Sequence, residues 1–322
     1  MRQLVAAGLA AISLAWSQAA LAQPAYPDRP IRMIIPVAPG GAPDIIGRVI
    51  GQRLQERMGQ PVAVENRSGS NGNIALEVVA KARPDGYTLI VAADSQITVN
   101  PALYERMPID VNKDLLPVAS LAGNQFVLSI NPSLPARTFQ EFIDLAKRSD
   151  PPLAFASGGI GSQHQLSMEL LMRRAGIRML HVPYRGGNPA ATATVAGEAA
   201  ATFSGTSSAP LIQQGLLRAL ATTGPRRSRI LPDLPTIGEF YPGYEVTIWQ
   251  GLFTTAGTPQ PVVDRLRREV NELLTEPDVI RRLGDGGGLE PMITTPEQFA
   301  ELIRSDSEKY ANLIREIGLK VE

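Results

Sequence analysis

Apolar and polar residues alternate along the chain with two different spacings, and these predict strands and helices in turn. Residues 31–35 form a short apolar run that stops at Pro36 and predicts a buried strand. From Asp44 onward, apolar residues recur with the spacing of one face of an amphipathic helix. The pattern continues with strands at 62–64 and 87–93 and a helix at 71–83. Strands separated by helices of this length predict βαβ units and a parallel sheet.

The same order of elements begins again further along the chain. The apolar pattern predicts strands at 153–156, 179–182, 200–203 and 217–221. Helices are predicted near 163–175, 188–196 and 207–215. The chain is therefore predicted to hold two α/β units rather than one.

Two long extended runs, at 118–130 and 244–255, suggest that the chain passes twice between two lobes. The C-terminal part is predicted to be helical, and its apolar faces need an apolar surface to cover, most simply that of the first lobe. Lobe 1 is therefore predicted to be discontinuous, with residues 24–121 plus 252–322, and lobe 2 is predicted at 122–251.

The first residues have the pattern of an export signal. Arg2 precedes an apolar run from Leu4 to Trp16, and Ala20-Leu21-Ala22 then forms a small-residue cleavage pattern. The alternative, an N-terminal anchor, is disfavoured because the run is short for a membrane span of about 20 residues. We expect a signal peptide at residues 1–22, cleaved after Ala22, and a periplasmic location.

Charge and composition exclude several function classes. The 322 residues carry 31 Lys+Arg and 31 Asp+Glu, so no global positive field attracts nucleic acid. The chain has no cysteine, which rules out thiolate nucleophiles and cysteine-ligated metals. Only two histidines are present, and no clustered Asp/Glu spacing supports a carboxylate metal site. We therefore expect no metal, no cofactor and no nucleic-acid partner.

Candidate binding loops follow the predicted strands, where open α/β sheets bind their ligands. The loop at 36–44 offers Ala38, Gly40 and Gly41, whose backbone N–H groups can approach a ligand, and Asp44, which can cap the next helix. An ordinary strand-to-helix turn would have the same composition. In the next loop, Arg67 is either an anion partner or a member of a surface ion pair.

The loop after the third strand contributes Ser95 and Gln96. In the second unit, Ser157, Ser162 and His164 stand in a glycine-rich loop that precedes a helix, a plausible cradle for a carboxylate. This loop lacks the Gly-x-Ser-x-Gly spacing of a nucleophile elbow. His164 is equally consistent with a ligand contact and with a surface histidine.

Two further loops complete the candidate set. Tyr184 offers a hydroxyl group, whereas His181, with apolar neighbours on a strand, fits a core histidine better than a ligand contact. Gly205 and Thr206 follow a strand and lie among small donors. The set is rich in N–H and O–H donors and modest in charge, which suits a carboxylate bound by neutral dipoles between two lobes.

These loops carry a family resemblance. The matching stretches include the 36–44 loop, Pro-Asp-Gly-Tyr-Thr-Leu at 84–89, Asn-Pro-Ala-Leu-Tyr at 100–104, His-Val-Pro-Tyr-Arg-Gly-Gly at 181–187 and Leu-Pro-Asp-Leu-Pro-Thr at 231–236. In this order they resemble the periplasmic substrate-binding proteins of tripartite tricarboxylate transporters, also called Bug receptors. The resemblance covers essentially the whole mature chain.

The resemblance implies a two-lobed, Venus-flytrap α/β fold in which each lobe is a mostly parallel sheet flanked by helices. It also implies that backbone amides and bridging waters of the first loop and of the loop after strand three hold a ligand carboxylate. Ser157, Ser162, His164 and Thr206 match second-lobe contacts. Some amino-acid-binding relatives place an acid in the stretch aligned with 204–208. This chain has none there, which favours a mono- or dicarboxylate or an aromatic acid.

The leading hypothesis is a monomeric, non-enzymatic receptor that delivers a small organic carboxylate to membrane transporter subunits or to a sensor. The alternative is a secreted serine hydrolase with Ser157 or Ser162 as nucleophile and His164 or His181 as base. No carboxylate is obviously placed to orient either histidine. The glycine-rich run at 284–288 has no functional interpretation.

Overall fold

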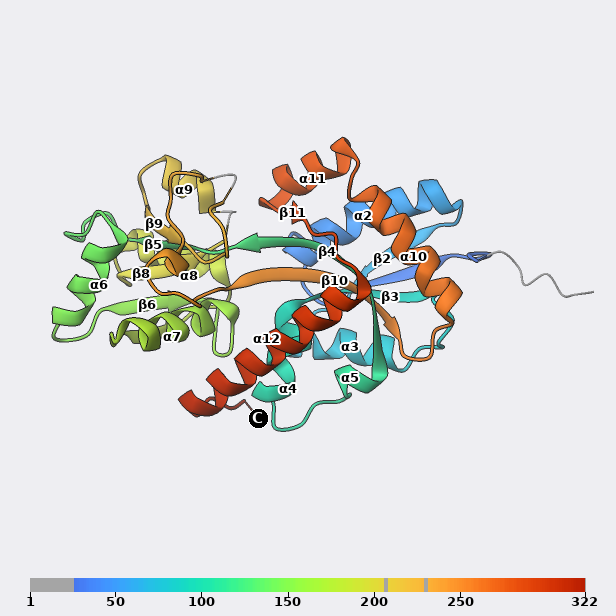
Figure 1. Ribbon diagram of the computed structural model, residues 1–322, viewed down its shortest axis with the longest axis horizontal. Helices are drawn as coiled ribbons and strands as arrows, with labels where there is room; N and C mark the ends of the chain where they lie inside the picture. The colour runs from blue at the N-terminus through green and yellow to red at the C-terminus, as the bar shows by residue number, and fades with distance from the viewer. Residues whose placement is uncertain (1–25, 206–207, 229–230, 322) are drawn as a thin grey trace, which may run out of the picture.

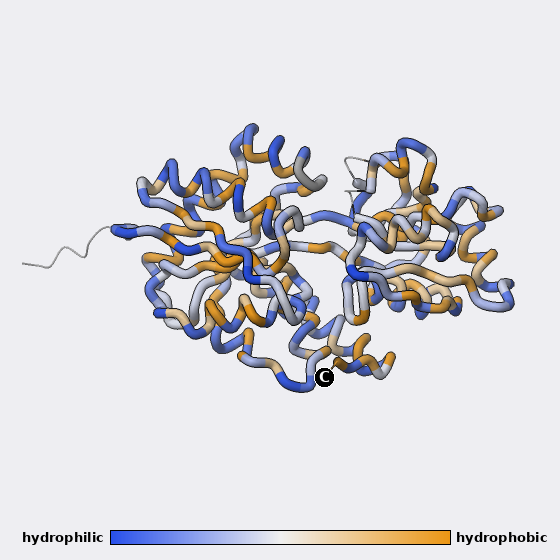
Figure 2. Tube along the Cα trace, turned by 180° about the vertical axis from the view of Figure 1, so that it is seen from behind, coloured by the Kyte–Doolittle hydropathy of each residue, from blue (hydrophilic) through white to orange (hydrophobic). Residues whose placement is uncertain are grey.

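The computed structural model describes residues 26–205, 208–228 and 231–321, and it shows two lobes side by side, joined by extended strands (Figure 1). The extended segments that join the two lobes are also visible from behind (Figure 2). The predicted signal peptide at 1–22 and the candidate contact Thr206 lie outside the described residues.

The first lobe is built on a six-stranded sheet. Its strands, in the spatial order β11-β4-β10-β3-β1-β2, are β11 (Glu290–Pro291), β4 (Leu115–Gln125), β10 (Thr247–Thr255), β3 (Thr88–Ala93), β1 (Ile31–Ile35) and β2 (Val62–Asn66). The strand β1 pairs in parallel with β2 and β3, whereas β10 pairs antiparallel with both β3 and β4.

Helices cover both faces of this sheet because successive strand residues point to opposite sides. On one face α2 (Ala42–Met58), α10 (Gln260–Leu273) and α11 (Pro277–Gly287) share an apolar core with Met33 and Val91. On the other face α3 (Asn73–Ala80) and α12 (Pro296–Ile317) pack against Ile34 and Ile90. Short helices α4 (Asn100–Leu103) and α5 (Val111–Asp114) connect β3 to β4.

The second lobe is built on a five-stranded sheet. Its order is β7 (Leu180–Pro183), β6 (Ala154–Ser157), β8 (Ala201–Ser204), β5 (Val127–Ile130) and β9 (Arg218–Thr222). Its helices are α6 (Phe139–Arg148), α7 (Gln163–Ala175), α8 (Gly187–Ala196) and α9 (Ala209–Gln213). Aromatic residues of α6 and apolar residues of α7 fill one core, and Ala190 of α8 packs with Ala156 in a separate small cluster.

The direction of the strands determines which loops face which lobe. Only Phe126 separates β4 from β5, so this segment runs from the first sheet into the second. The strands β1, β2 and β3 run in the direction of β4, whereas β6, β7, β8 and β9 all run against β5. The carboxyl ends of the first set therefore point toward lobe 2, and those of the second set point toward lobe 1.

The prediction of a two-lobed α/β fold is confirmed. Most strands of each sheet share one direction, as expected, but both sheets are mixed because β10, β11 and β5 run against the rest. The extended runs predicted at 118–130 and 244–255 contain the connections. In the first sheet, β4 ends at Gln125 and β10 begins at Thr247. The lobe boundaries proposed from the sequence stay a prediction.

The glycine-rich run at 284–288 lies at the end of α11. Gly288 takes up a left-handed conformation there (φ 60°) and ends the helix. A Cβ atom added to Gly284, inside the helix, would meet no atom within 4 Å. The run therefore has a local role as a helix end.

Two glycine-to-alanine changes test the packing of the crossing strand β10. A Cβ atom at Gly251 would lie 2.5 Å from Phe299 Cζ and 2.9 Å from Phe253 Cε2. We expect Gly251→Ala to lower the free energy of unfolding by about 1–3 kcal/mol through overpacking. Gly284→Ala is the matched control, and it should raise stability by about 0.5–1 kcal/mol because alanine favours helix. Urea unfolding followed by circular dichroism measures both, and equal effects would contradict the packing at β10.

Candidate functional site

The loop between β1 and α2 is shaped by the carboxylate of Asp44, whose side chain is only 4% exposed. Its Oδ2 accepts hydrogen bonds from the backbone N–H of Gly40 (2.9 Å) and from Arg48 Nε (3.0 Å). Its Oδ1 accepts from Asn66 Nδ2 (2.8 Å), so the loops after β1 and β2 are tied together. Asp44 therefore holds the loop in place, and the exposed Gly40 and the half-exposed Gly41 present backbone beside it.

The charge of Asp44 follows from these partners. Burial alone would raise the pKa of this carboxyl group, but hydrogen bonds from Arg48, Gly40 and Asn66 outweigh it and hold the pKa below its ordinary value. Asp44 is thus ionised at neutral pH. Ala38 is exposed in the same loop.

Arg67 takes the second of its two predicted roles. Its guanidinium group is exposed and lies 3.5 Å from the carboxylate of Glu65, which also accepts from Arg32 (2.9 Å). It is therefore part of a surface ion-pair cluster at the end of β2.

The loop after β3 and the turn before α3 pack against each other. Gln96 is buried, and its Oε1 accepts from the backbone N–H of Ala93 (2.8 Å). Its amide group packs against Gly72, where an added Cβ atom would lie 2.6 Å from Nε2. Asn71 Nδ2 donates to Asn100 Oδ1 (2.6 Å) across the same contact. The half-exposed Ser95 opens η2 (Ser95–Val99), a short π-helix.

In the second lobe, the serine hydroxyl groups are used to hold their own loop. Ser157 is fully buried, and its Oγ lies 2.6 Å from His181 Nε2, which ties the ends of β6 and β7 together. Ser162 caps α7 by accepting from the backbone N–H of Gln165 (3.3 Å), and it donates to the carbonyl of Gly159 (2.7 Å).

His164 lies in a slot formed by two glycines and an aromatic ring. Added Cβ atoms at Gly158 and Gly187 would lie 2.9 Å from its Nδ1 and 2.7 Å from its Nε2, and its ring is 4.5 Å from that of Phe126. Its buried Nδ1 has no hydrogen-bond partner among the described residues. Burial lowers the pKa of His164 to about 4, so the imidazole is neutral at physiological pH.

Tyr184 uses its hydroxyl group within the second lobe, where it donates to Glu198 Oε2 (2.9 Å). Gly205 is half-exposed after β8, and its carbonyl accepts from the backbone N–H of Ser208 (2.9 Å). The predicted ligand contacts of both residues stay predictions.

One hydrogen bond that sequence analysis did not single out joins the two sets of loops. Gln163 Nε2, at the start of α7, donates to Oδ2 of Asp94, directly after β3, at 2.5 Å, and both side chains are buried. The signal in the sequence was an acidic residue that directly follows the apolar run at 89–93, a position at which a charge is costly.

The hydrolase alternative requires an accessible serine and a histidine that a carboxylate orients. The structure does bring Ser157 to His181, but Ser157 is fully buried and His181 stacks on Phe155. Within residues 26–205, 208–228 and 231–321, no carboxylate hydrogen-bonds to either histidine.

The part of the chain that the structure describes contains no cluster of three or more acidic or histidine side chains able to hold a metal ion. Over the same ranges, no helix is both long and apolar enough to cross a membrane.

The role of Asp44 can be tested through pH. Because its pKa is lower in the folded protein than in the unfolded chain, its contribution is present above the ordinary pKa of aspartate and is lost as pH falls toward the native value. We expect Asp44→Asn to cost about 1–3 kcal/mol at pH 7 and to narrow the stability difference between pH 7 and pH 3. Urea unfolding measures both; Asp233→Asn, at an exposed position, is the control. An unchanged pH profile in Asp44→Asn would refute this role.

Comparison with known proteins agrees with this architecture. Residues 46–319 match the model of the tripartite tricarboxylate transporter family receptor. The chain is 34% identical over 321 residues to protein BugT of Bordetella pertussis, and the alignment covers 98% of each chain. Members of the family are periplasmic solute-binding receptors rather than enzymes, and they pair with membrane transporter subunits, so the serine hydrolase alternative is wrong.

Two solved structures with bound carboxylates are similar throughout. Rpa4515 of R. palustris with adipate has a TM-score of 0.80 and 31% identity, over 92% of this chain and 99% of that one. MatC from Rhodopseudomonas palustris with bound malate has a TM-score of 0.74 and 30% identity, over 90% and 100%. By both sequence and structure, the chain belongs to the tripartite tricarboxylate transporter receptor family, which includes the Bug proteins.

Proposed function

We propose that this protein captures a small organic dicarboxylate or monocarboxylate between its lobes and delivers it to membrane transporter subunits. The observation that carries this proposal is the direction of the strands: the carboxyl ends of β1–β3 and of β6–β9 point toward one another. Ligands of open α/β sheets bind at these ends. The adipate and malate bound to Rpa4515 and MatC make an aliphatic dicarboxylate the first candidate.

The chemistry of the loops favours binding by neutral groups. Arg48 and Arg67 are both paired with acids and His164 is neutral, while Arg185, in the loop after β7, is an exposed cation. We therefore assign ligand contact to the backbone of Ala38, Gly40 and Gly41, to Ser95 and Gln96, and to His164, Gly205 and Thr206.

We assign a positioning role to the other predicted site residues. Asp44, Ser157 and Ser162 hold the loops through their own hydrogen bonds, and Tyr184 pairs with Glu198. No acidic residue stands at 204–208 to pair with an ammonium group, which disfavours amino acids as ligands.

Export, processing and assembly complete the proposal. The N-terminal pattern supports removal of residues 1–22 after Ala22 in the periplasm. We propose that the mature chain, with lobe 1 at 24–121 plus 252–322 and lobe 2 at 122–251, acts as a monomer. A sensor that receives the loaded receptor is the second candidate partner.

A thermal-shift screen tests the ligand class. Purified mature protein is heated with adipate, malate, benzoate or aspartate, and with adipamide as a control without carboxylates. We expect a dicarboxylate at about 100 times its Kd to add about 2.7 kcal/mol of stability and so to raise Tm, whereas adipamide should not. A panel in which no organic acid raises Tm would contradict the proposal.

A substitution in the first loop tests the position of the site. We expect Gly41→Trp to abolish the ligand-induced rise in Tm, because the bulky ring fills the space in front of the exposed backbone. The control is Lys81→Trp, at an exposed position after α3, which should retain the full rise. If Gly41→Trp responds to ligand as the wild type does, the first loop is not part of the site.

A further inference from the structure

The hydrogen bond between Asp94 and Gln163 crosses from one lobe to the other. Asp94 follows β3 of the first sheet, and Gln163 begins α7 of the second lobe. Both side chains are buried, so the 2.5 Å contact is closed to solvent. The two lobes are therefore held against each other at this point by a polar pair.

This pair lies beside an apolar seam that both lobes build. Val99 and Leu103 come from the segment after β3, Leu166 comes from α7, and Tyr310 and Ile314 come from α12. Three polar atoms at the seam, Asp94 Oδ1, Gln163 Oε1 and the hydroxyl of Tyr310, form no hydrogen bond of good geometry among the described residues, although the Gln163 side chain lies close enough to the Tyr310 hydroxyl to act on its pKa. Burying polar atoms without partners is costly. Opening of the lobes would expose these atoms to water and so remove that cost.

The charges around Asp94 favour its neutral form. On α12, Asp306 accepts from Trp249 Nε1 (2.8 Å) and from Lys309 Nζ (2.6 Å). The nearby cation is thus already bound to another acid. Burial, followed by the charge of Asp306, raises the pKa of Asp94 well above its ordinary value, although the backbone N–H of Ser95, Lys309 and the Gln163 amide act the other way.

The other elements packed here add no further charge. On α12, Tyr310 is the remaining titratable group that faces Asp94, and burial also raises its pKa. The strand β10 contributes Trp249 and Gln250 beside the end of β3, and α7 contributes Gln163. None of these three side chains titrates.

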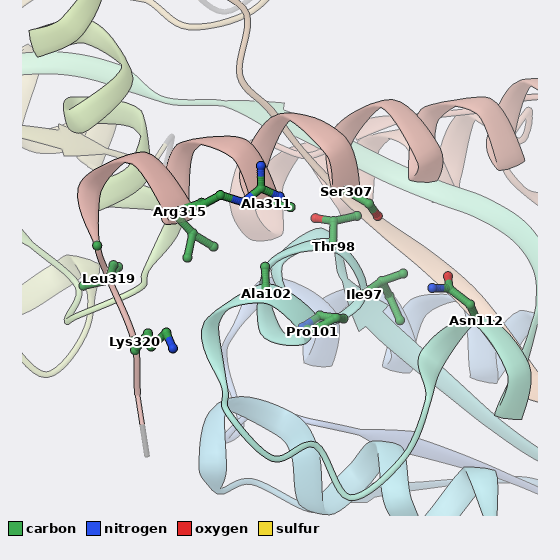
Figure 3. A pocket seen from close by; sticks show the side chains of 12 residues that line it. Ile97, Thr98, Pro101, Ala102, Asn112, Ser307, Ala311, Arg315, Leu319 and Lys320 are labelled. Atoms are coloured by element: carbon green, nitrogen blue, oxygen red, sulfur yellow. The ribbon is translucent and has the colours of Figure 1, made fainter.

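Asp94 is also connected to the proposed ligand loop. It immediately precedes Ser95 and Gln96, and its carbonyl accepts from Thr98 Oγ1 (2.8 Å). On the other side of η2, Ile97 and Thr98 line a cavity of about 490 Å³ whose opposite wall is α12, with Ser307 and Ala311 (Figure 3). Asp94 thus links the proposed ligand loop to the second lobe, and the π-helix η2 that follows Asp94 faces α12.

We propose that Asp94 is a positioning residue for ligand binding: with Gln163 it forms an inter-lobe clasp that stabilises the closed receptor, and closing the clasp takes up one proton from solvent. The inference rests on the proposed function, because closure over a carboxylate is what the clasp would stabilise. The proton goes to the carboxylate of Asp94 as it leaves water, and no other bond changes.

The sign of the pH dependence follows from this linkage. In the open receptor Asp94 is hydrated and titrates as an ordinary aspartate. In the closed receptor its pKa is raised, so the stabilisation of closure is complete below the ordinary value and is lost as pH rises through the raised one. Ligand affinity therefore falls with rising pH, by up to about tenfold per pH unit for one proton.

Isothermal titration with adipate or malate, from about pH 4.5 to about pH 9, tests the proton linkage. The carboxyl groups of the probe titrate in the lower part of this range, so the wild type is compared at each pH with Asp94→Asn, a neutral isostere that can still accept from Gln163. The affinity of the wild type relative to that of Asp94→Asn should fall as pH rises. A ratio of the two affinities that does not change with pH overturns the proposal.

The inter-lobe bond itself is tested with Gln163→Ala. This variant should bind the same probe about 5- to 30-fold more weakly, whereas Gln140→Ala should bind as the wild type does. Gln140 is the control because it is an exposed glutamine at the start of α6, in the same lobe, and bonds to Asp144 (3.0 Å). Equal affinities of Gln163→Ala and the wild type overturn the clasp.

A ligand-free measurement separates failure of the clasp from failure of the proposed function. Small-angle scattering of the unliganded protein should give a larger radius of gyration for Asp94→Ala and for Gln163→Ala than for the wild type. The double variant should be no larger than either single one, and Asp94→Asn and Gln140→Ala should match the wild type. Circular dichroism confirms that each variant is folded. Unchanged or additive radii overturn the clasp even if no carboxylate binds.

Discussion

The continuity of β4 into β5 is the constraint on which the arrangement of this receptor depends. One extended segment belongs to both sheets, with only Phe126 between its two strands. Since β1–β3 run with β4 and β6–β9 run against β5, the carboxyl ends of both sets must face the space between the lobes. The loops that begin α2 and η2 in lobe 1 therefore face the loops that begin α7 and α8 in lobe 2. This follows from the strand directions alone and requires no contact between the loops.

This arrangement divides the polar residues of the loops into two groups. Asp44, Ser157 and Ser162 satisfy backbone groups of their own loops, because an unpaired N–H in a partly buried turn is costly. Whether these side chains also contact a ligand stays a prediction. What the loops can offer is the backbone that these side chains hold in position, together with the uncharged Gln96 and His164.

Much of the fold could be predicted from the sequence, because it follows from local periodicity. The buried strand at 31–35 and the two extended crossings are present, and the helix expected from Asp44 begins two residues earlier, at Ala42, with Gly41 rather than Asp44 as its N-cap. The pairing of side chains could not be predicted in the same way. Ser157 with His181, Tyr184 with Glu198 and Asp94 with Gln163 join residues far apart in the chain, and only the packing of strands and lobes decides which of them meet.

Asp44 and Asp94 show how position decides the charge of the same side chain. Both are buried beyond the carboxyl ends of neighbouring strands, but Asp44 accepts from a guanidinium group, whereas Asp94 accepts from the Gln163 amide and the Ser95 backbone N–H and faces Asp306. Two like charges about 4 Å apart repel by about 4 kcal/mol at an effective dielectric constant of about 20. An ionised Asp94, directly before Ser95 and Gln96, would place a negative charge beside the proposed ligand loop. A neutral Asp94 removes that charge, which favours closure of the receptor over an anion.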